Sequence, residues 1–157
     1  MPRLFPVLLL LLFAGLALPG SAADTNRVGY LSLDGVRIEL HDSAARIDVD
    51  YTLDPGMGVI IMFLGTGDLQ RKVERALNFP SLQAGEVGLG HAVFTAEDAA
   101  ESYGDRAFWF PAHSFGVTFP RVEVAAPGYS LFYTDARAIP KGFGYFGKGP
   151  EGPPRSG

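Results

Sequence analysis

The chain has 157 residues, with 13 basic and 17 acidic side chains, a formal net charge of −4 and no cysteine. The acidic balance disfavours a nucleic-acid partner or an anionic membrane surface, because both are themselves negatively charged. The absence of cysteine excludes a disulfide framework and an acylated lipoprotein anchor, so stability has to come from a packed core. The 20 glycines, 12 prolines and 12% aromatic residues suit a β-rich domain with many tight turns.

Residues 1–23 have the pattern of a secretory signal peptide. Arg3 supplies a positive charge, Leu4–Leu18 is nearly continuous hydrocarbon, and Gly20–Ala23 offers small residues for cleavage. The apolar run of about fifteen residues is shorter than the roughly twenty that a membrane-spanning helix needs, although an uncleaved anchor is the alternative. We therefore expect a secreted or cell-surface protein without a membrane span after cleavage.

The rest of the chain reads as one domain followed by a tail. No internal repeat or interdomain linker is visible between residues 24 and 146, so we expect a single β-rich globular domain there. Residues 147–157 are rich in glycine and proline and contain no large hydrophobic side chain, which predicts a disordered tail.

An unbroken apolar run, Val59–Leu64, predicts the central strand of the sheet. It shows no alternation, so as a strand it could bury both of its faces. The turn signal Asp54-Pro55-Gly56 precedes it and would deliver the chain into this strand.

One amphipathic helix is predicted over about 67–79, packed on the sheet. Its apolar positions recur at four, seven and eight residues, and charged residues fill the opposite face. Thr66 or Asp68 can cap its first turn, and Pro80 would end it. The apolar positions are Leu69, Val73, Ala76 and Leu77.

Two alternating segments, residues 36–40 and 45–53, predict an antiparallel hairpin. Opposed residues share a face, so the connecting loop must hold an even number of residues. A loop of residues 43–44 or 42–45 would place Leu40 opposite Ile47 and Glu39 opposite Asp48.

Further strands are predicted along the rest of the chain. Residues 95–103 could form a short helix or the polar tip of a hairpin that returns along residues 106–110, and we favour the hairpin. The remaining strand candidates are residues 27–33, 87–94, 115–119, 121–125 and 129–134, with Ala126-Pro127-Gly128 as the turn before the last. Together these elements predict an α+β fold that is mainly antiparallel β, with sandwich-like sheets and one helix.

Histidines are the first candidates for metal binding or catalysis. His41 shares the polar face of the first hairpin with three carboxylates and could hold a cation, although a solvated sheet face is the favoured interpretation. His91 is in phase with apolar neighbours, which predicts a hydrogen-bonded core histidine. The carboxylates near His41 are Glu39, Asp48 and Asp50.

His113 lies beside Ser114 and follows the aromatic segment Phe108-Trp109-Phe110. Adjacency in sequence does not make a nucleophile and its base, and neither a nucleophile elbow nor a zinc-binding helix motif is present, so a hydrolase is poorly supported. Trp109, His113 and Tyr133 could instead contact a sugar or a protein partner, with core packing as the alternative. We expect no cofactor, and Gly65–Asp68 completes no nucleotide-binding motif.

Three sequence segments resemble segments of small exported proteins of methanogenic archaea that have no assigned function. They are Leu64-Gly65-Thr66-Gly67-Asp68-Leu69-Gln70-Arg71-Lys72, then Phe108-Trp109-Phe110-Pro111-Ala112-His113 with Phe115-Gly116, and Pro140-Lys141-Gly142-Phe143-Gly144-Tyr145-Phe146. The resemblance implies an extracytoplasmic archaeal setting and transfers no catalytic residue.

The sequence favours a non-enzymatic interaction or structural module of the cell envelope. Such a module would contact a protein partner, a larger surface structure or copies of itself through edge strands and the Trp109 region. A binding module for a carbohydrate or another small ligand is the alternative, and a small metal-dependent or Ser/His hydrolase comes third. A long uncovered strand, a concave aromatic pocket, or convergent histidines and carboxylates would distinguish the three.

Overall fold

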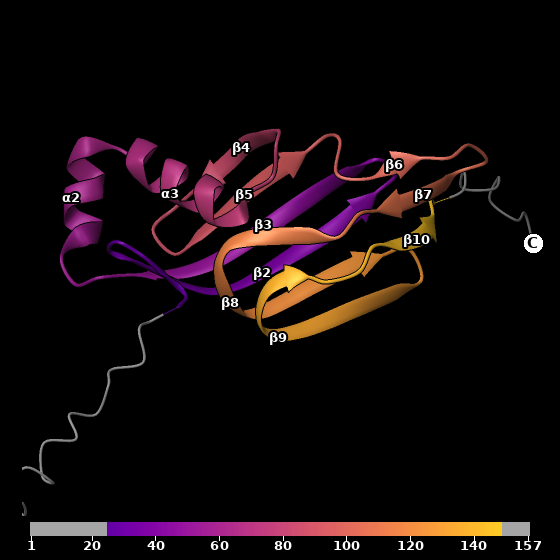
Figure 1. Ribbon diagram of the computed structural model, residues 1–157. Coiled ribbons are helices and arrows are strands. Elements are labelled where there is room, and N and C mark those ends of the chain that lie inside the picture. Colours follow the sequence, from indigo (N-terminus) through magenta and orange to yellow (C-terminus); the bar gives the residue numbers. More distant parts are fainter. Residues whose placement is uncertain (1–24, 149–157) are drawn as a thin grey trace, which may run out of the picture.

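The computed structural model describes residues 25–148 and has an α+β fold dominated by antiparallel strands (Figure 1). The expected signal peptide 1–23 and most of the expected tail 147–157 lie outside the described residues. The larger sheet has the strand order β4-β5-β3-β2-β8-β9, with β1 pairing β2 at one end, and the smaller sheet has the order β10-β7-β6. Only the pairing of β2 with β8 is parallel among these strand pairs.

The strands and helices have the following bounds. The large sheet contains β1 (Arg27–Val28), β2 (Leu31–His41), β3 (Ala44–Leu53), β4 (Leu82–Val87), β5 (His91–Ala96), β8 (His113–Ala126) and β9 (Tyr129–Ile139). The small sheet contains β6 (Glu101–Ser102), β7 (Ala107–Phe110) and β10 (Phe143–Phe146). The described helices are α2 (Met57–Leu64) and α3 (Gly67–Leu77).

The β2–β3 hairpin forms as predicted, but the predicted register was wrong by two residues. Its loop is Asp42-Ser43, so Leu40 lies opposite Ala45 and Glu39 lies opposite Arg46. Asp42 has a φ of 51°, and aspartate tolerates this left-handed conformation better than most side chains. The observed register also replaces the unfavourable Glu39–Asp48 opposition with one of opposite charges.

The later strands are longer and differently divided than predicted. The predicted strand 87–94 is instead the end of β4, a turn at residues 88–90, and β5. The two candidates at 115–119 and 121–125 are parts of one strand, β8, which turns at residues 127–128 into β9. Residues 95–103 form neither the short helix nor the predicted hairpin tip, because β5 ends at Ala96 and pairs with β3 and β4, while β6 pairs with β7 in a short hairpin that turns at residues 103–106. Strand β10 was not anticipated because its segment is rich in glycine.

Helix α3 matches the predicted amphipathic helix. Its buried residues are the four expected apolar positions, and it packs mainly against β8. The helix ends at Leu77. The next residue, Asn78, adopts a left-handed conformation with a φ of 57° and lies two residues before Pro80. Thr66 occupies the N-cap position, but its side-chain oxygen accepts no capping hydrogen bond from the first turn.

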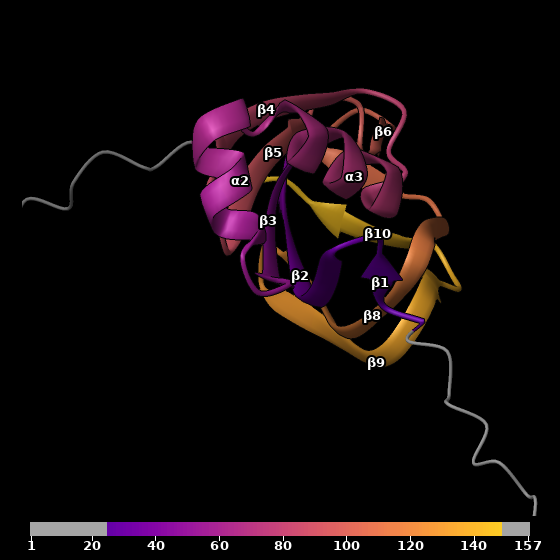
Figure 2. The same ribbon diagram turned by 90° about the vertical axis from the view of Figure 1, so that its left-hand side faces the viewer.

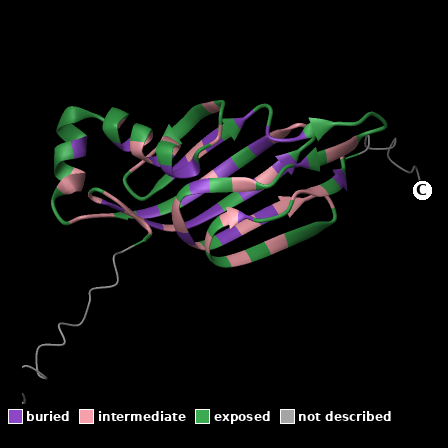
Figure 3. Cartoon of the chain, in the orientation of Figure 1, coloured by how far each residue is buried: buried purple, intermediate pink, exposed green. Residues whose placement is uncertain are grey.

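The prediction of a central strand at Val59–Leu64 was wrong, because these residues form α2. Gly56 and Gly65 bound this helix, each with a φ of 86° that favours glycine. Only Ile61 is buried, and most of the helix surface is exposed at one end of the molecule (Figure 3). The strand next to β3 is therefore β5 rather than this run.

The core lies between the large sheet on one side and α3 with the small sheet on the other. Figure 2 views the molecule from the α2 end and shows the large sheet curling from β4 and β5 round to β8 and β9. The small sheet is fixed to the β2–β3 turn, because the Tyr145 hydroxyl donates to the Asp42 carbonyl and the Ala100 amide donates to the Ser43 carbonyl. The buried side chains form one cluster, and no polar or charged residue among those described is buried.

Candidate functional surfaces

Trp109 lies on the outside of the small sheet and is 42% exposed. It pairs with Gly144 across β7 and β10, and its indole also lies close to Gly142. These glycines leave room for the ring to lie flat on the sheet. Trp109 is thus a partly exposed aromatic side chain without an adjoining cavity among the described hollows.

His113 is half-buried and is already engaged with α3. Its Nε2 donates a hydrogen bond to the Leu77 carbonyl at 2.8 Å, and its ring stacks on Phe79 with centroids 3.9 Å apart. Phe115 packs edge-on against the same ring. Burial lowers the pKa of His113, with the Leu77 hydrogen bond partly opposing it, so the ring is held neutral.

The three predicted contact residues do not come together. Trp109 lies on β7 of the small sheet, His113 begins β8, and Tyr133 lies on β9 opposite Val122, where it packs partly against the core. The sequence grouped these residues by type, but the His113 ring contacts Leu77, Phe79 and Phe115 instead.

The four candidate metal ligands divide into two groups. Glu39 Oε2 lies 4.0 Å from His41 Nε2, whereas Asp50 accepts a hydrogen bond from His91 Nδ1 at 2.9 Å. Asp48 is hydrogen bonded to the Arg46 guanidinium, which lowers the pKa of that carboxyl. Among residues 25–148, no three histidine or carboxylate side chains are arranged to hold a metal ion.

His91 was predicted to be a core histidine, and this was wrong. Its side chain is 46% exposed, because Ala92, Phe94 and Ala96 form the inward face of β5 instead. The inner face of this strand therefore begins one residue later than the sequence pattern suggested. His91 joins the polar outer face of the sheet with Asp50.

A hollow of about 450 Å³ lies over the outer face of β3, β2, β8 and β9. Two charged pairs border it: Arg37 lies 3.5 Å from Glu123, and Asp50 pairs with His91. Arg121 also lines the hollow, and its side chain has no hydrogen-bond or ion-pair partner among the described residues. The other residues that line the hollow include Gly35, Phe132, Tyr133 and Thr134.

Strand β9 forms an edge of the large sheet. Residues Tyr129–Thr134 pair regularly with β8 on one side, and no described strand pairs with their other side. This segment, which we call the β9 edge, carries no charge, and its Phe132 is 71% exposed. Beyond it the ladder is irregular, and Asp135 has a φ of 48°.

The sequence contains a signal for this surface that does not depend on any functional motif. Six consecutive uncharged residues with high β propensity, next to a Pro-Gly turn, mark an edge strand that lacks the charges or prolines by which edges are usually protected. The importance of Phe132 itself depends on which strand is outermost, and that follows only from the topology.

Comparison with known proteins gives no family assignment. No protein-family model, curated protein or solved structure matches this chain. Within the described part of the chain, neither helix is long and apolar enough to cross a bilayer. Function has to be argued from the surfaces themselves.

Proposed function

We propose that this protein is an exported, non-enzymatic structural module of the cell envelope that associates with a second copy of itself through the β9 edge. The observation that carries the proposal is the unpaired, charge-free backbone edge of Tyr129–Thr134. Such an edge presents free N–H and C=O groups that a second strand can satisfy.

A two-fold symmetric pairing fits this edge. In an antiparallel ladder, opposed residues share a face, so the symmetry axis passes through a residue position. An axis at Phe132 places the two copies of this exposed ring opposite each other, with Ser130 opposite Thr134 and Leu131 opposite Tyr133. No like charges meet within residues 130–134, and the two large sheets would become continuous.

The other edge of the large sheet disfavours open-ended growth. Strand β4 is interrupted by a bulge between Ala84 and Glu86, and Glu86 adds a charge at this edge. Bulges and charges are the usual means of blocking edge pairing. We therefore expect a closed dimer rather than a filament.

The placement of the histidines supports a non-enzymatic role. His41 contacts Glu39 near the β2–β3 turn, His91 pairs with Asp50, and His113 is tied to the end of α3. Asp50 lies opposite Gly35, six residues along β2 from His41, which corresponds to about 20 Å of strand. No two of these histidines share a described hollow or a carboxylate.

Light scattering coupled to size exclusion tests the proposal on the mature chain expected after export. The mass should rise from monomer to dimer with increasing concentration, and Phe132→Lys should keep the chain monomeric because a lysine at the centre of the edge disrupts pairing.

Phe146→Lys is the matched control, because Phe146 on β10 is 72% exposed and lies outside the β9 edge. This control should still dimerise. A wild-type chain that remains monomeric at high concentration, or a Phe132→Lys chain that dimerises normally, would remove the proposal.

A second candidate function is binding of a carboxylated sugar in the hollow beside Phe132. The observation that favours it is Arg121, which has no partner among the described residues and lies near the exposed aromatic ring of Phe132. Arginine binds carboxylates in a forked geometry, and an aromatic ring can cover the apolar face of a sugar.

NMR titration with glucuronate and glucose tests this second function. Glucuronate should shift the amide signals of residues around Arg121 more than glucose does, and Arg121→Ala should abolish the difference. Arg137→Ala, on the neighbouring strand β9 but outside the hollow, should retain it. Equal responses to the two sugars would rule out recognition by Arg121.

A further inference from the structure

Helix α2 carries an exposed apolar surface that the fold does not use. All eight of its residues, Met57–Leu64, are apolar or glycine, yet only Ile61 is buried. Met62, Phe63 and Leu64 are 75%, 86% and 83% exposed. We define the α2 surface as the exposed residues of this helix and its neighbour: Val59, Ile60, Met62, Phe63, Leu64 and Leu89.

This surface is unusual for a helix in a protein domain. A helix that covers a core normally buries an apolar stripe and exposes polar residues, as α3 does. A helix that is apolar on every side is usually surrounded by other apolar groups. Because most α2 side chains contribute little to the packed core, their chemistry calls for a contact outside the domain.

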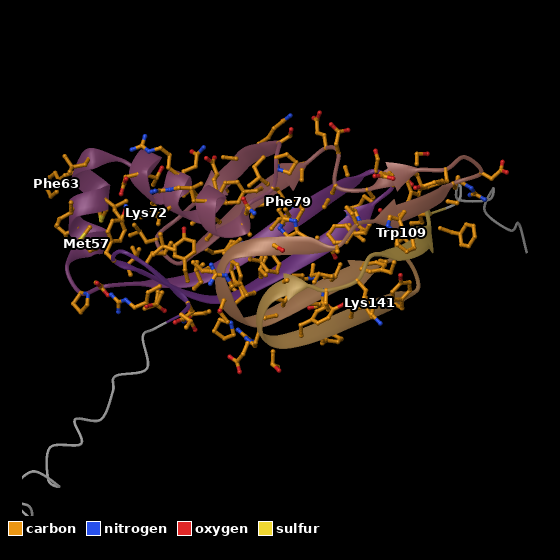
Figure 4. The ribbon with its side chains drawn as sticks, in the orientation of Figure 1. Met57, Phe63, Lys72, Phe79, Trp109 and Lys141 are labelled. Carbon is orange, nitrogen blue, oxygen red and sulfur yellow. The ribbon has the colours of Figure 1, made fainter. Side chains whose placement is uncertain are left out.

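We propose that α2 is a membrane-contact surface whose apolar side chains insert into the interfacial layer of a lipid bilayer. A helix of eight residues is about 12 Å long, far too short to span the bilayer but long enough to lie in its surface. Phe63 projects outward at the extreme end of the molecule in Figure 4, so nothing described obstructs its approach to a flat surface.

The position of the chain start favours a bilayer as the occupant. Arg27 is bonded to Asp54 at 2.7 Å, which ties β1 to the turn that leads into α2. The described chain thus begins in the half of the molecule that carries α2 and ends at the opposite end (Figure 1). Residues 19–24 can extend over at most about 20 Å, so the apolar segment Leu4–Leu18 would hold this half close to the membrane during export.

The size of the α2 surface argues against a second copy as the occupant. The α2 surface offers only a short cluster on one helix, and a helix bonds its own backbone groups, so a second copy would gain no strand pairing there as it does at the β9 edge. A bilayer needs no shape complementarity and accepts side chains that lack hydrogen-bond partners. Insertion of a few exposed apolar side chains would give weak, reversible binding, comparable to that of a single lipid chain.

The residues next to α2 are suited to the headgroup layer. Helix α3 follows after only Gly65-Thr66 and carries Arg71 and Arg75 on its exposed side, whereas the Lys72 side chain is only 17% exposed. Lys72 bonds to Asp68 at 2.9 Å, whereas Arg75 has no acidic partner among the described residues. Long basic side chains beside an apolar surface can reach headgroup phosphates while α2 enters the acyl region.

Tryptophan fluorescence with vesicles tests the proposal on the mature chain. The natural Trp109 lies on the small sheet, away from α2 in Figure 4, so its emission should not change. Phe63→Trp should show a blue shift on addition of phosphatidylcholine vesicles, and inclusion of phosphatidylglycerol should strengthen binding. Phe146→Trp, at a position that is 72% exposed and lies on β10 at the opposite end, should show no shift.

Co-sedimentation with the same vesicles measures how much binding is lost when the α2 surface is changed. Phe63→Asp should lower the partition coefficient about tenfold or more, because it replaces an inserted ring with a charge. Phe146→Asp should leave it unchanged. Failure of the wild-type chain to bind either vesicle type would overturn the proposal. A dimer that Phe63→Asp converts to a monomer would also overturn it, because α2 would then be a contact between two copies of the chain.

Discussion

His113 illustrates how one side chain links the helix to the sheet. Its ring is stacked on Phe79 and its Nε2 donates to the last residue of α3, Leu77, while its backbone belongs to β8. Burial lowers the pKa of this histidine below its ordinary value near 6.5. The folded chain therefore takes up a proton on His113 only at a lower pH than the unfolded chain does.

This difference predicts a pH-dependent stability. Below about pH 6.5 the unfolded chain gains a proton at residue 113 before the folded chain does, so the free energy of unfolding falls as the pH falls. His113→Gln keeps an N–H donor but does not titrate. Urea unfolding between about pH 7.5 and 5 should therefore show the stability gap between wild type and variant narrowing with acidity. Parallel pH profiles would contradict this role.

At the scale of elements, α2 has one buried side chain, that of Ile61. Ile61→Ala should lower the free energy of unfolding by about 2–5 kcal/mol, as expected for truncation of a buried aliphatic residue. Phe63→Ala should change it by less than about 0.5 kcal/mol, because that ring is exposed. Chemical denaturation of both variants measures these changes. A large loss of unfolding free energy in Phe63→Ala would mean that the apolar run Val59–Leu64 is buried.

The close packing of α3 against β8 depends on Gly116. A Cβ at Gly116 would collide with the carbonyl oxygen of Arg75 in the last turn of the helix. Gly116→Ala should therefore destabilise the protein by about 1–3 kcal/mol, since backbone rather than a flexible side chain would have to move. Gly67→Ala, at a position with open space around it, is the control and should be tolerated in the same thermal unfolding assay.

These elements explain what the sequence could and could not predict. Periodicity identified α3 and its four buried residues, because a clear apolar stripe leaves no alternative. A six-residue apolar run has no such stripe, so α2 and a buried strand could not be distinguished by pattern. The hairpin was identified but its register was not, because the choice of loop depended on the left-handed conformation of Asp42.

The candidate sites were harder to predict, because function here depends on topology rather than on motifs. Trp109, His113 and Tyr133 were chosen for their chemistry, but they belong to three different strands, β7, β8 and β9. Phe132 belongs to a strand that was expected, yet its place at the open edge follows from the parallel β2–β8 pairing that sets β9 outermost. Nothing in the local sequence specifies that long-range pairing.

At the scale of the whole molecule, two uncharged surfaces face in different directions. The α2 surface lies at one end, and the β9 edge runs along one side (Figure 1). A dimer joined at β9 would carry two copies of α2, so membrane contact and self-association are compatible and can be tested independently. Because the β9 pairing is antiparallel, the two α2 surfaces would lie at opposite ends of the dimer, and each would contact a bilayer separately.

Hydrogen exchange of the mature chain at low and high concentration tests the central claim most directly. Alternate amides of residues 129–134 point away from β8 and should exchange quickly in the monomer. We predict that these amides become protected as concentration rises, while those on the free side of β4 do not. Unchanged exchange along residues 129–134 under conditions where the mass doubles would contradict pairing through the β9 edge.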